Sequence, residues 1–342
     1  MDIRIKEENL SNKSFSRIIV KNSLGMKLTL FSLGASLYSL KINKKGEEIE
    51  TLIAPNSLEA FIDKDQYFGK TIGRVAGRID KGILNFEGKN ILLEKNWNNI
   101  SFLHGGKNGL SNKNFIFNIE RFDNHCNVIF ESLIQQKEDK IPGTLKINVT
   151  YVIYENDNKF DIKFNYSCNK RSIANFTNHA CFNLNGSGNI LKDELYINAN
   201  KCGYVNDELI SSKIDSVNNV LDFTKTKAIG EFINDDSLKN HTCRGYDHPY
   251  ILNSHSLNDI ACKLVNQDKS LSLIIKTTFP CLVVYTCNYP TNELLTNGEI
   301  DSQHNGICLE CSFIPNSINM GLDDSIVQPN VEYTNTISYI FE

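Results

Sequence analysis

Apolar and polar residues alternate most regularly in the middle of the chain. Residues 145–153 carry an apolar side chain at every second position, and residues 160–166 repeat this spacing. A period of two residues is typical of a β-strand with one buried face. Because the short polar stretch 155–158 joins the two segments, the pattern predicts a long antiparallel hairpin with one face in the core.

Apolar stretches bounded by Gly, Asn and Pro predict further strands. They cover residues 27–33, 193–199, 271–278, 282–286 and 333–341. Two segments, 57–61 and 228–233, predict helices that are too short to carry a fold. No strand–helix alternation, fixed repeat or low-complexity linker appears. The sequence therefore predicts an all-β fold, a large antiparallel β-sandwich formed as a single domain over residues 1–342, with a few short helices.

Composition narrows the class of protein. A length of 342 residues with 41% hydrophobic and 22% charged residues indicates a globular protein with a large core. A net charge of −4 and a pI near 6.0 build no positive field for a phosphate backbone, which disfavours nucleic acid as a partner. The N-terminus lacks the apolar centre of a signal peptide, and no later run is long enough to span a membrane. We therefore expect a cytoplasmic protein with no membrane partner.

The ten cysteines are scattered through the chain. In a chain of this length without an export signal, we expect reduced thiols, most of them packed in the core. Cys308 and Cys311 have the C-x-x-C spacing of a redox or zinc pair. Because no second such pair is present, this spacing alone does not predict a metal site.

One histidine stands among polar residues in a region patterned for strands. His179 lies in the sequence NFTNHACFNL, residues 175–184, where amides and a hydroxyl surround it. An imidazole titrates near neutrality, so it can give a proton to an oxygen and recover it at working pH. Taken alone, His179 is better explained as a half-buried residue that neighbouring Asn side chains satisfy. Four further polar stretches favour a catalytic interpretation.

Those four stretches contribute arginines, a second histidine and two carboxylates. Arg74 and Arg78 stand four residues apart and share one face if their segment is extended. His104 precedes a glycine pair that permits close approach of backbone or ligand. Each residue also has a structural explanation: Arg78 as a surface charge, His104 as a turn residue, Asp247 as a turn former before a proline, and Glu310 as a carboxylate on an edge strand.

Taken together, these stretches resemble the aldose 1-epimerases, also called galactose mutarotases. The resemblance runs from residue 69 to the C-terminus and keeps the order of the family's motifs. The matching segments are 73–79 (GRVAGRI), 103–106 (LHGG), 139–143 (DKIPG), 178–184 (NHACFNL), 246–249 (YDHP), 277–280 (TTFP), 285–288 (YTCN) and 308–319 (CLECSFIPNSIN).

Several positions depart from the residues usual in that family. Gly77 stands where many members have an Asn that touches the sugar, Ala180 and Cys181 replace Ser and Tyr, and Ser312, Asn316 and Ser317 replace Gln, Asp and Ala. The polar residues carried over as functional are all present. The departures therefore bear on substrate preference more than on catalysis.

The resemblance implies a galactose mutarotase-like sandwich with its pocket on a concave sheet face. It also implies an isomerase that interconverts the α and β anomers of free hexoses such as glucose and galactose. That reaction removes the proton of the C1 hydroxyl and adds one to the ring oxygen, after which the open aldehyde turns about C1–C2 and recloses. One base and one acid suffice. By resemblance, Glu310 is the base and His179 the acid.

The resemblance also assigns the substrate contacts. His104 is expected to hydrogen-bond near the ring oxygen, Arg78 and Asp247 to hold sugar hydroxyls, and Phe279 to present a flat apolar surface to the sugar. No step moves electrons or forms a covalent intermediate, so neither a cofactor nor a metal is expected. The expected partner is the aldose, and the chain is expected to be a monomer or a homodimer.

Two alternatives remain open. A hexose-6-phosphate epimerase shares this broad sandwich family, but it needs cationic phosphate ligands, and Arg74 and Arg78 are the only close arginine pair in the motifs. A non-catalytic sugar-binding module on the same fold needs an arginine, an aspartate and an aromatic surface, but it has no use for Glu310 together with His179.

The paired acid and base predict a bell-shaped pH dependence of kcat/KM. With Glu310 ionised and His179 protonated, the rate rises as the carboxyl loses its proton and falls as the imidazole loses its own. Ordinary pKa values of about 4.3 and about 6.5 leave a narrow optimum on the acid side. We therefore expect a nearby carboxylate, most simply Glu310 itself, to raise the pKa of His179.

Overall fold

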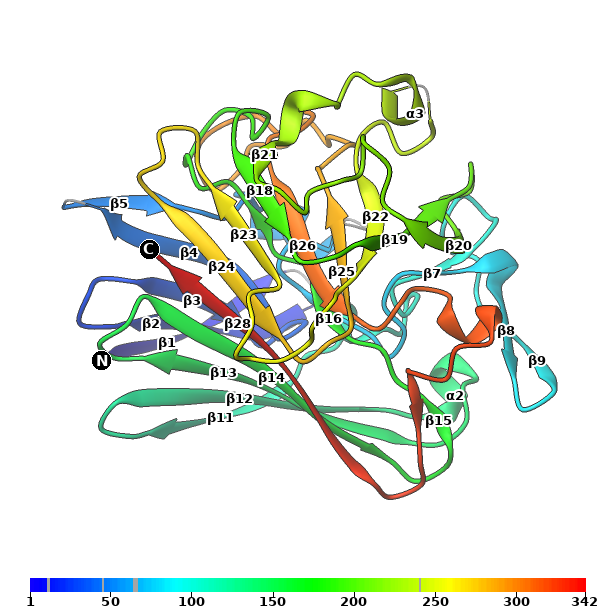
Figure 1. The fold of residues 1–342 in the computed structure, drawn as a ribbon. Helices are drawn as coiled ribbons and strands as arrows, with labels where there is room; N and C mark the ends of the chain where they lie inside the picture. Colours follow the sequence, from blue (N-terminus) through cyan, green and yellow to red (C-terminus); the bar gives the residue numbers. More distant parts are fainter. Residues whose placement is uncertain (11–12, 45, 64–66, 240) are drawn as a thin grey trace.

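The largest element of the structure is a nine-stranded antiparallel sheet. It appears in a computed structural model that describes residues 1–10, 13–44, 46–63, 67–239 and 241–342 (Figure 1). In spatial order its strands are β11 (Ile116–Arg121), β12 (His125–Ile134), β13 (Leu145–Tyr154), β14 (Lys159–Cys168), β28 (Glu332–Phe341), β24 (Ser272–Thr277), β23 (Cys262–Val265), β18 (Glu194–Ile197) and β21 (Lys227–Ala228).

A second, six-stranded sheet packs against the first and carries the functional site. In spatial order its strands are β17 (Cys181–Phe182), β26 (Ile307–Ser312), β25 (Cys281–Tyr285), β22 (Asp247–Ile251), β19 (Lys201–Val205) and β20 (Ser211–Ser216). Neighbouring strands are antiparallel throughout. In Figure 1, β26, β25 and β22 lie beside one another near the centre of the molecule.

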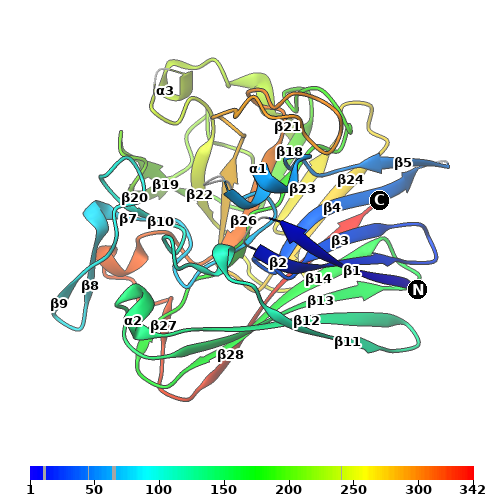
Figure 2. The same ribbon diagram turned by 180° about the vertical axis from the view of Figure 1, so that it is seen from behind.

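The N-terminal part of the chain forms a third sheet, a five-stranded meander that is seen most clearly from behind (Figure 2). Its strands are β1 (Asp2–Leu10), β2 (Lys13–Lys21), β3 (Lys27–Phe31), β4 (Ser36–Lys44) and β5 (Glu47–Glu50). Four two-stranded ribbons complete the strands: β6 (Thr71–Ile72) with β16 (Thr177–Asn178), β7 (Arg78–Ile79) with β10 (Phe102–Leu103), β8 (Ile83–Phe86) with β9 (Lys89–Leu92), and β15 (Ser172–Ile173) with β27 (Ile326–Val327).

Helices are few and short. The α-helices are α1 (Leu58–Asp63), α2 (Gln136–Asp139) and α3 (Asp236–Lys239), and the 3₁₀ turns are η1 (Asp80–Gly82), η2 (Leu110–Asn112), η3 (Ile229–Glu231) and η4 (Ser317–Met320). Within the part of the chain that the structure describes, no helix is long and apolar enough to cross a membrane.

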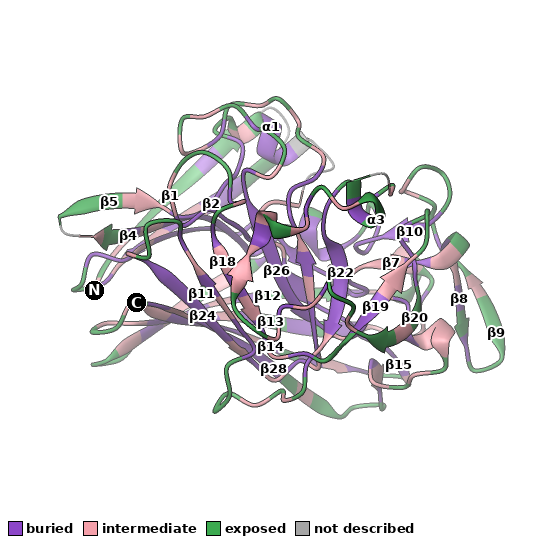
Figure 3. Ribbon diagram, turned by 45° about the horizontal axis from the view of Figure 1, so that its top comes forward, coloured by how far each residue is buried: buried purple, intermediate pink, exposed green. Residues whose placement is uncertain are grey.

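The core lies between the sheets because alternate side chains of each strand turn inward. On β13 these are the apolar residues of the predicted alternation, from Leu145 to Ile153, and Tyr151 among them donates its buried hydroxyl to the carbonyl oxygen of Ala35 at 2.8 Å. The same cluster includes Phe182 of β17 and Leu309 of β26, so both large sheets contribute to one apolar interior. Figure 3 shows buried residues concentrated on these central strands, while β9 is largely exposed.

The predicted hairpin is confirmed. Strands β13 and β14 pair from Leu145 with Cys168 to Ile153 with Phe160. The other five predicted strands are also present with shifted ends, as β3, β18, β24, β25 and β28. The first predicted helix is α1, where Ser57 Oγ accepts a hydrogen bond from the Ala60 backbone N–H at 3.2 Å.

One predicted helix and two of the alternative structural explanations do not agree with the structure. The segment 228–233 forms only the 3₁₀ turn η3, and the N–H groups of Ile229 and Gly230 at its start donate to the backbone of Asp193 and Leu191. The structural explanation of Asp247 as a turn former fails, since it begins β22. Glu310 is not on an edge strand, because β26 lies between β17 and β25.

Candidate active site

A cavity of about 210 Å³ opens on the face of the six-stranded sheet that turns away from the core. Strand alternation produces both faces. On β26, Leu309 and Cys311 point into the apolar interior, while Glu310 and Ser312 line the cavity. Strands β25 and β22 alternate in the same way, so the pleat that builds the core also presents polar side chains to the cavity.

Strand register aligns the floor of the cavity. Cys181 on β17 lies opposite Cys308 on β26, Cys308 lies opposite Tyr285 on β25, and Tyr285 lies opposite Asp247 on β22. Residues from four separate parts of the sequence thereby form one lateral row. Glu310 is two residues farther along β26 on the same face, beside this row.

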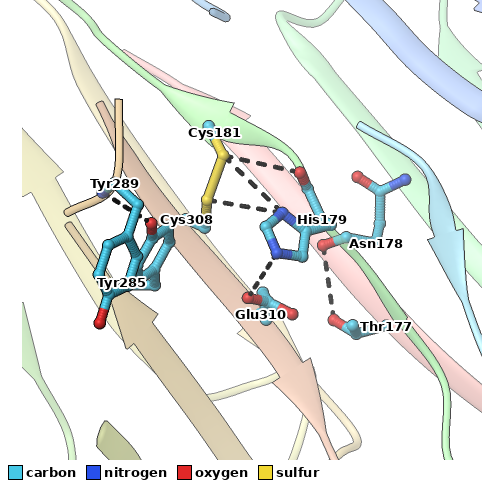
Figure 4. Close-up of a disulfide and its surroundings, with 8 residues drawn as sticks. All are labelled: Thr177, Asn178, His179, Cys181, Tyr285, Tyr289, Cys308 and Glu310. Carbon is cyan, nitrogen blue, oxygen red and sulfur yellow. Dashed lines mark hydrogen bonds and ion pairs between the residues drawn. A yellow bond between two sulfur atoms is a disulfide. The ribbon is translucent and has the colours of Figure 1, made fainter. Parts of the chain in front are cut away.

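His179 and Glu310 face each other in the cavity (Figure 4). His179 Nε2 is 3.5 Å from Glu310 Oε1, and the two side chains are 12% and 6% exposed. The backbone positions the imidazole firmly, since the N–H of His179 donates to Lys70 O at 3.0 Å and its own carbonyl oxygen accepts from Gly69 N at 2.8 Å. The sequence prediction that these two residues belong together agrees with this geometry.

Burial changes the protonation of this pair from what we expected. Burial raises the pKa of Glu310 to about 8, with Asp247 adding to the increase and Arg78 opposing it. Burial also lowers the pKa of His179 to about 4, although a hydrogen bond opposes that change. The expectation that Glu310 would raise the pKa of His179 is therefore wrong, because loss of hydration dominates and the positive charge of Arg78 adds to the decrease. Between these values the pair holds one proton, and the neutral form of each group is favoured.

His104 and Gly77 are joined by two hydrogen bonds. The backbone N–H of Gly77 donates to His104 Nδ1 at 3.2 Å, and the backbone N–H of His104 donates to Gly77 O at 3.1 Å. Burial, helped by His179 and Arg78, holds the pKa of His104 well below its usual value. Since Nδ1 accepts, the neutral ring carries its proton on Nε2 and is a hydrogen-bond donor.

The glycine after His104 confirms the expected close approach of backbone. Gly105 has a φ of 87°, and a Cβ at this position would lie 2.2 Å from the carbonyl oxygen of Gly73. A side chain here would push the loop after β10 away from the backbone of Gly73, so Gly105 helps to hold His104 in place.

Arg78 and Asp247 both line the cavity and form an ion pair. Arg78 Nη1 donates to Asp247 Oδ2 at 3.3 Å, and the guanidinium lies 4.7 Å from the ring centroid of Trp97. Burial raises the pKa of Asp247, and Arg78 opposes that rise. Among the described residues, Arg78 Nε is buried and has no hydrogen-bond partner. The pair therefore has donor capacity left for a polar ligand.

Arg74 does not share this site, although the sequence suggested a common face. Its side chain is fully buried and binds Asp139 through two hydrogen bonds of 2.6 Å each. Its remaining N–H groups donate to Ser172 Oγ and to backbone carbonyls of residues 141–143. The segment before β7 is not extended as a strand, so the two arginines diverge.

Phe279 is also misplaced by the sequence prediction. It is 0% exposed and packs edge-on against Phe164 and Phe313, with ring centroids 5.8 and 5.5 Å apart. Its ring therefore belongs to the core and does not face a sugar in the cavity. The aromatic surface comes instead from Trp97 and Tyr285, which line the cavity.

Sequence reasoning missed Trp97 and Tyr67 entirely. Tyr67 lies over the two histidines, with ring centroids 4.7 Å from His104 and 5.9 Å from His179. Trp97 is the only tryptophan of the chain and stands shortly before the His104 motif, which was an available signal. Tyr67 gives no comparable signal, because tyrosine is common in this sequence.

The cysteine prediction needs one correction. Cys181 and Cys308 form a disulfide between β17 and β26, while the other eight cysteines are free and buried. Cys311 is not the partner of Cys308, because side chains three residues apart on a strand point to opposite faces. Two sets of groups in the described residues are close enough to hold a metal ion: His179 with Cys181 and Cys308, and His104 with His179 and Glu310.

Comparison with known proteins gives a consistent result. The family model described as Aldose 1-epimerase matches residues 16–340. The aldose 1-epimerase of Escherichia coli K12 is 30% identical over 339 residues, covering 95% of this chain and 94% of that protein, and human galactose mutarotase is 28% identical over 323 residues, covering 92% and 91%. The crystal structure of galactose 1-epimerase from Lactobacillus acidophilus superposes with a TM-score of 0.87 at 27% identity, covering 100% of this chain and 98% of that one. The expected galactose mutarotase fold is confirmed, and the chain belongs to the aldose 1-epimerase family of isomerases.

Proposed function

We propose that this protein interconverts the α and β anomers of free aldohexoses such as glucose and galactose. The observation that carries the proposal is the contact between His179 Nε2 and Glu310 Oε1, 3.5 Å apart in the cavity. A pair that shares one proton holds one acid and one base at the same time, which is what ring opening and reclosure require. The relatives described above support the reaction class.

In the proposed mechanism Glu310 takes the C1 hydroxyl proton while His179 gives a proton to the ring oxygen. The free site favours the opposite placement of the shared proton, on the carboxyl group. Sugar hydroxyls that donate to Glu310 would favour its carboxylate form, so substrate binding would move the proton toward His179. Reclosure on the other face of the aldehyde then returns both protons and restores the pair.

The surrounding side chains suit a neutral sugar. His104 offers an Nε2–H donor, and Arg78 and Asp247 offer a donor and an acceptor to vicinal hydroxyls. Trp97 and Tyr285 present the flat apolar surface that we had expected of Phe279. Positioning by several such contacts brings the anomeric centre to the acid and base and lowers the entropic barrier.

A phosphorylated hexose fits this cavity less well. The sequence suggested that Arg74 and Arg78 could together bind a phosphate. Arg74, however, pairs with Asp139 and does not line the cavity. Among the described residues that line the cavity, Arg78 is the only arginine, and it already contacts Asp247. A phosphate there would bring added negative charge close to Asp247 and Glu310.

The test is polarimetry on freshly dissolved α-glucose and α-galactose with wild type, Glu310→Gln and His179→Asn. Because an acid or base group typically contributes about 10²–10⁴-fold, each variant should lose at least about 10²-fold in kcat. Calorimetry should still detect sugar binding, and circular dichroism should show an intact fold. A folded variant with a near-wild-type rate would contradict these roles, and sugar binding by the wild type without catalysis would favour the non-catalytic module.

A further inference from the structure

The disulfide Cys181–Cys308 lies directly against His179. Cys181 Sγ and Cys308 Sγ are 3.9 and 3.7 Å from His179 Nδ1, the ring nitrogen that faces away from Glu310 (Figure 4). Both sulfur atoms are buried, and Cys181 lines the cavity together with His179. The Nε2 atom of His179 therefore faces the carboxyl group of Glu310, and the Nδ1 atom faces the two sulfur atoms.

The spacing of these three groups is close to that of a tetrahedral zinc site. Zn–S bonds of about 2.3 Å and Zn–N bonds of about 2.0–2.1 Å place adjacent ligand atoms about 3.5–3.8 Å apart. The two nitrogen–sulfur distances already have nearly this length. Only the two sulfur atoms must separate, which requires cleavage of the bond between them.

We propose that reduction of Cys181–Cys308 creates a site for zinc or another thiophilic divalent ion, with Cys181 Sγ, Cys308 Sγ and His179 Nδ1 as ligands and water in the fourth position. A phosphine reductant and one water molecule cleave the S–S bond, giving a phosphine oxide and two thiols. Zinc then displaces one proton from each thiol and binds the neutral imidazole. Two thiolates balance the charge of the ion, which keeps the buried site neutral.

Metal binding at Nδ1 would stop the acid–base cycle of His179, a consequence that rests on the proposed function. The ring would carry a proton on Nε2, facing Glu310, and could not accept a second proton to become imidazolium. In the oxidised protein the two sulfur atoms of this site are bonded to each other and cannot act as thiolate ligands, so the activity should not respond to the same ion. The cysteine pair thereby makes the activity of this chain sensitive to zinc only under reducing conditions.

The competing ligand sets differ in ways that an experiment can separate. His104, His179 and Glu310 would hold a metal through nitrogen and oxygen atoms alone, without sulfur. Cys311 turns to the opposite face of β26 and packs in the core, so the C-x-x-C motif does not supply the pair. The sulfur ligands are therefore diagnostic of the proposed site.

The first measurement is cobalt(II) titration of the full-length protein after phosphine reduction, followed by visible and near-ultraviolet absorption. We expect one cobalt per chain with a thiolate-to-cobalt charge-transfer band, and zinc should displace it. Oxidised wild type, Cys181→Ala and Cys308→Ala should lack the band. Cys126→Ala is the matched control, because it removes a buried free thiol on β12 and should keep the band. A band that survives in both pair variants, or a reduced wild type without any band, would overturn the proposal.

The second measurement is mutarotation by reduced protein with and without saturating zinc. The reduced wild type should lose about 10²-fold in kcat and regain it with a chelator, because a typical acid–base contribution disappears. Cys181→Ala should have the same rate with and without zinc, whatever that rate is. A cobalt band without inhibition would overturn the effect on His179. Cobalt binding in a protein with no mutarotase activity would instead refute the proposed function and leave the metal site supported.

Discussion

Arg74 and Arg78 belong to one short motif and each meets an aspartate, yet the two pairs differ in how completely they are bonded. Arg74 donates six hydrogen bonds, two of them to Asp139 at 2.6 Å, and its side chain is 0% exposed. Arg78 reaches Asp247 once, at 3.3 Å, and leaves a buried Nε without a partner among the described residues. A saturated pair holds the fold together, whereas an unsaturated pair at a cavity has capacity left to bind a ligand.

The largest effect is expected from breaking the saturated pair. Arg74→Met would leave Asp139 buried without its counterion, and removal of one partner of a buried pair costs about 3–5 kcal/mol of unfolding free energy. Urea denaturation measures this loss. Asp139→Asn, which keeps the shape of the side chain, should also destabilise the protein. A loss below about 1 kcal/mol in Arg74→Met would show that this pair is not structural.

Breaking the unsaturated pair should affect catalysis more than stability. Arg78→Met removes hydrogen bonds to a charged donor that are worth about 1.5–3 kcal/mol, so kcat/KM should fall about 10–100-fold, mostly through KM. Polarimetric kinetics over a range of sugar concentrations separates the two parameters. Its loss of stability in urea should be smaller than that of Arg74→Met, and the reverse order would undo the comparison.

The pH dependence of kcat/KM tests the protonation of a third pair in the site, His179 and Glu310. The one-proton state should persist from about pH 4, where the imidazole gains a proton, to about pH 8, where the carboxyl loses its own. We therefore expect kcat/KM to be level between these limits and to fall about tenfold per pH unit outside them. A narrow optimum near pH 5 would instead support the ordinary pKa values of both groups.

Removal of Glu310 should increase stability at alkaline pH. Its folded pKa of about 8 is above the ordinary 4.5, so the folded protein binds the extra proton and loses this stabilisation as pH rises through 8. Glu310→Gln has no such loss. Its Tm should match that of wild type near pH 4 and exceed it at pH 9 by about 1–2 °C for each kcal/mol relieved, because a chain of 342 residues has a large entropy of unfolding. Equal melting temperatures at both pH values would show that burial of Glu310 is not costly.

Sequence patterns predicted the parts of this molecule that depend on local periodicity. The hairpin of β13 and β14 follows from alternation alone, and the five polar residues of the site follow from motif resemblance. Phe279 could not be placed in this way, because its face depends on packing against Phe164 and Phe313 from other strands.

Long-range pairing and burial were equally hidden from the sequence. Cys181 and Cys308 are 127 residues apart, so no local spacing indicates their pairing, and the sequence predicted reduced thiols instead. The direction of the pKa change at His179 also depends on enclosure by segments distant in the chain, which no local pattern reports. The sequence shows which side chains are present, but it does not show how deeply each one is buried.

The alternation of β26 ties the chemistry to the assembly of the sheet. If this strand paired one residue out of register, Glu310 would turn into the apolar interior and Leu309 would turn toward the cavity. Placing a polar group among apolar side chains without a hydrogen bond costs about 2–7 kcal/mol. The carboxyl group that we propose to transfer the proton therefore also disfavours the wrong strand register, because a mispaired chain would be both inactive and less stable.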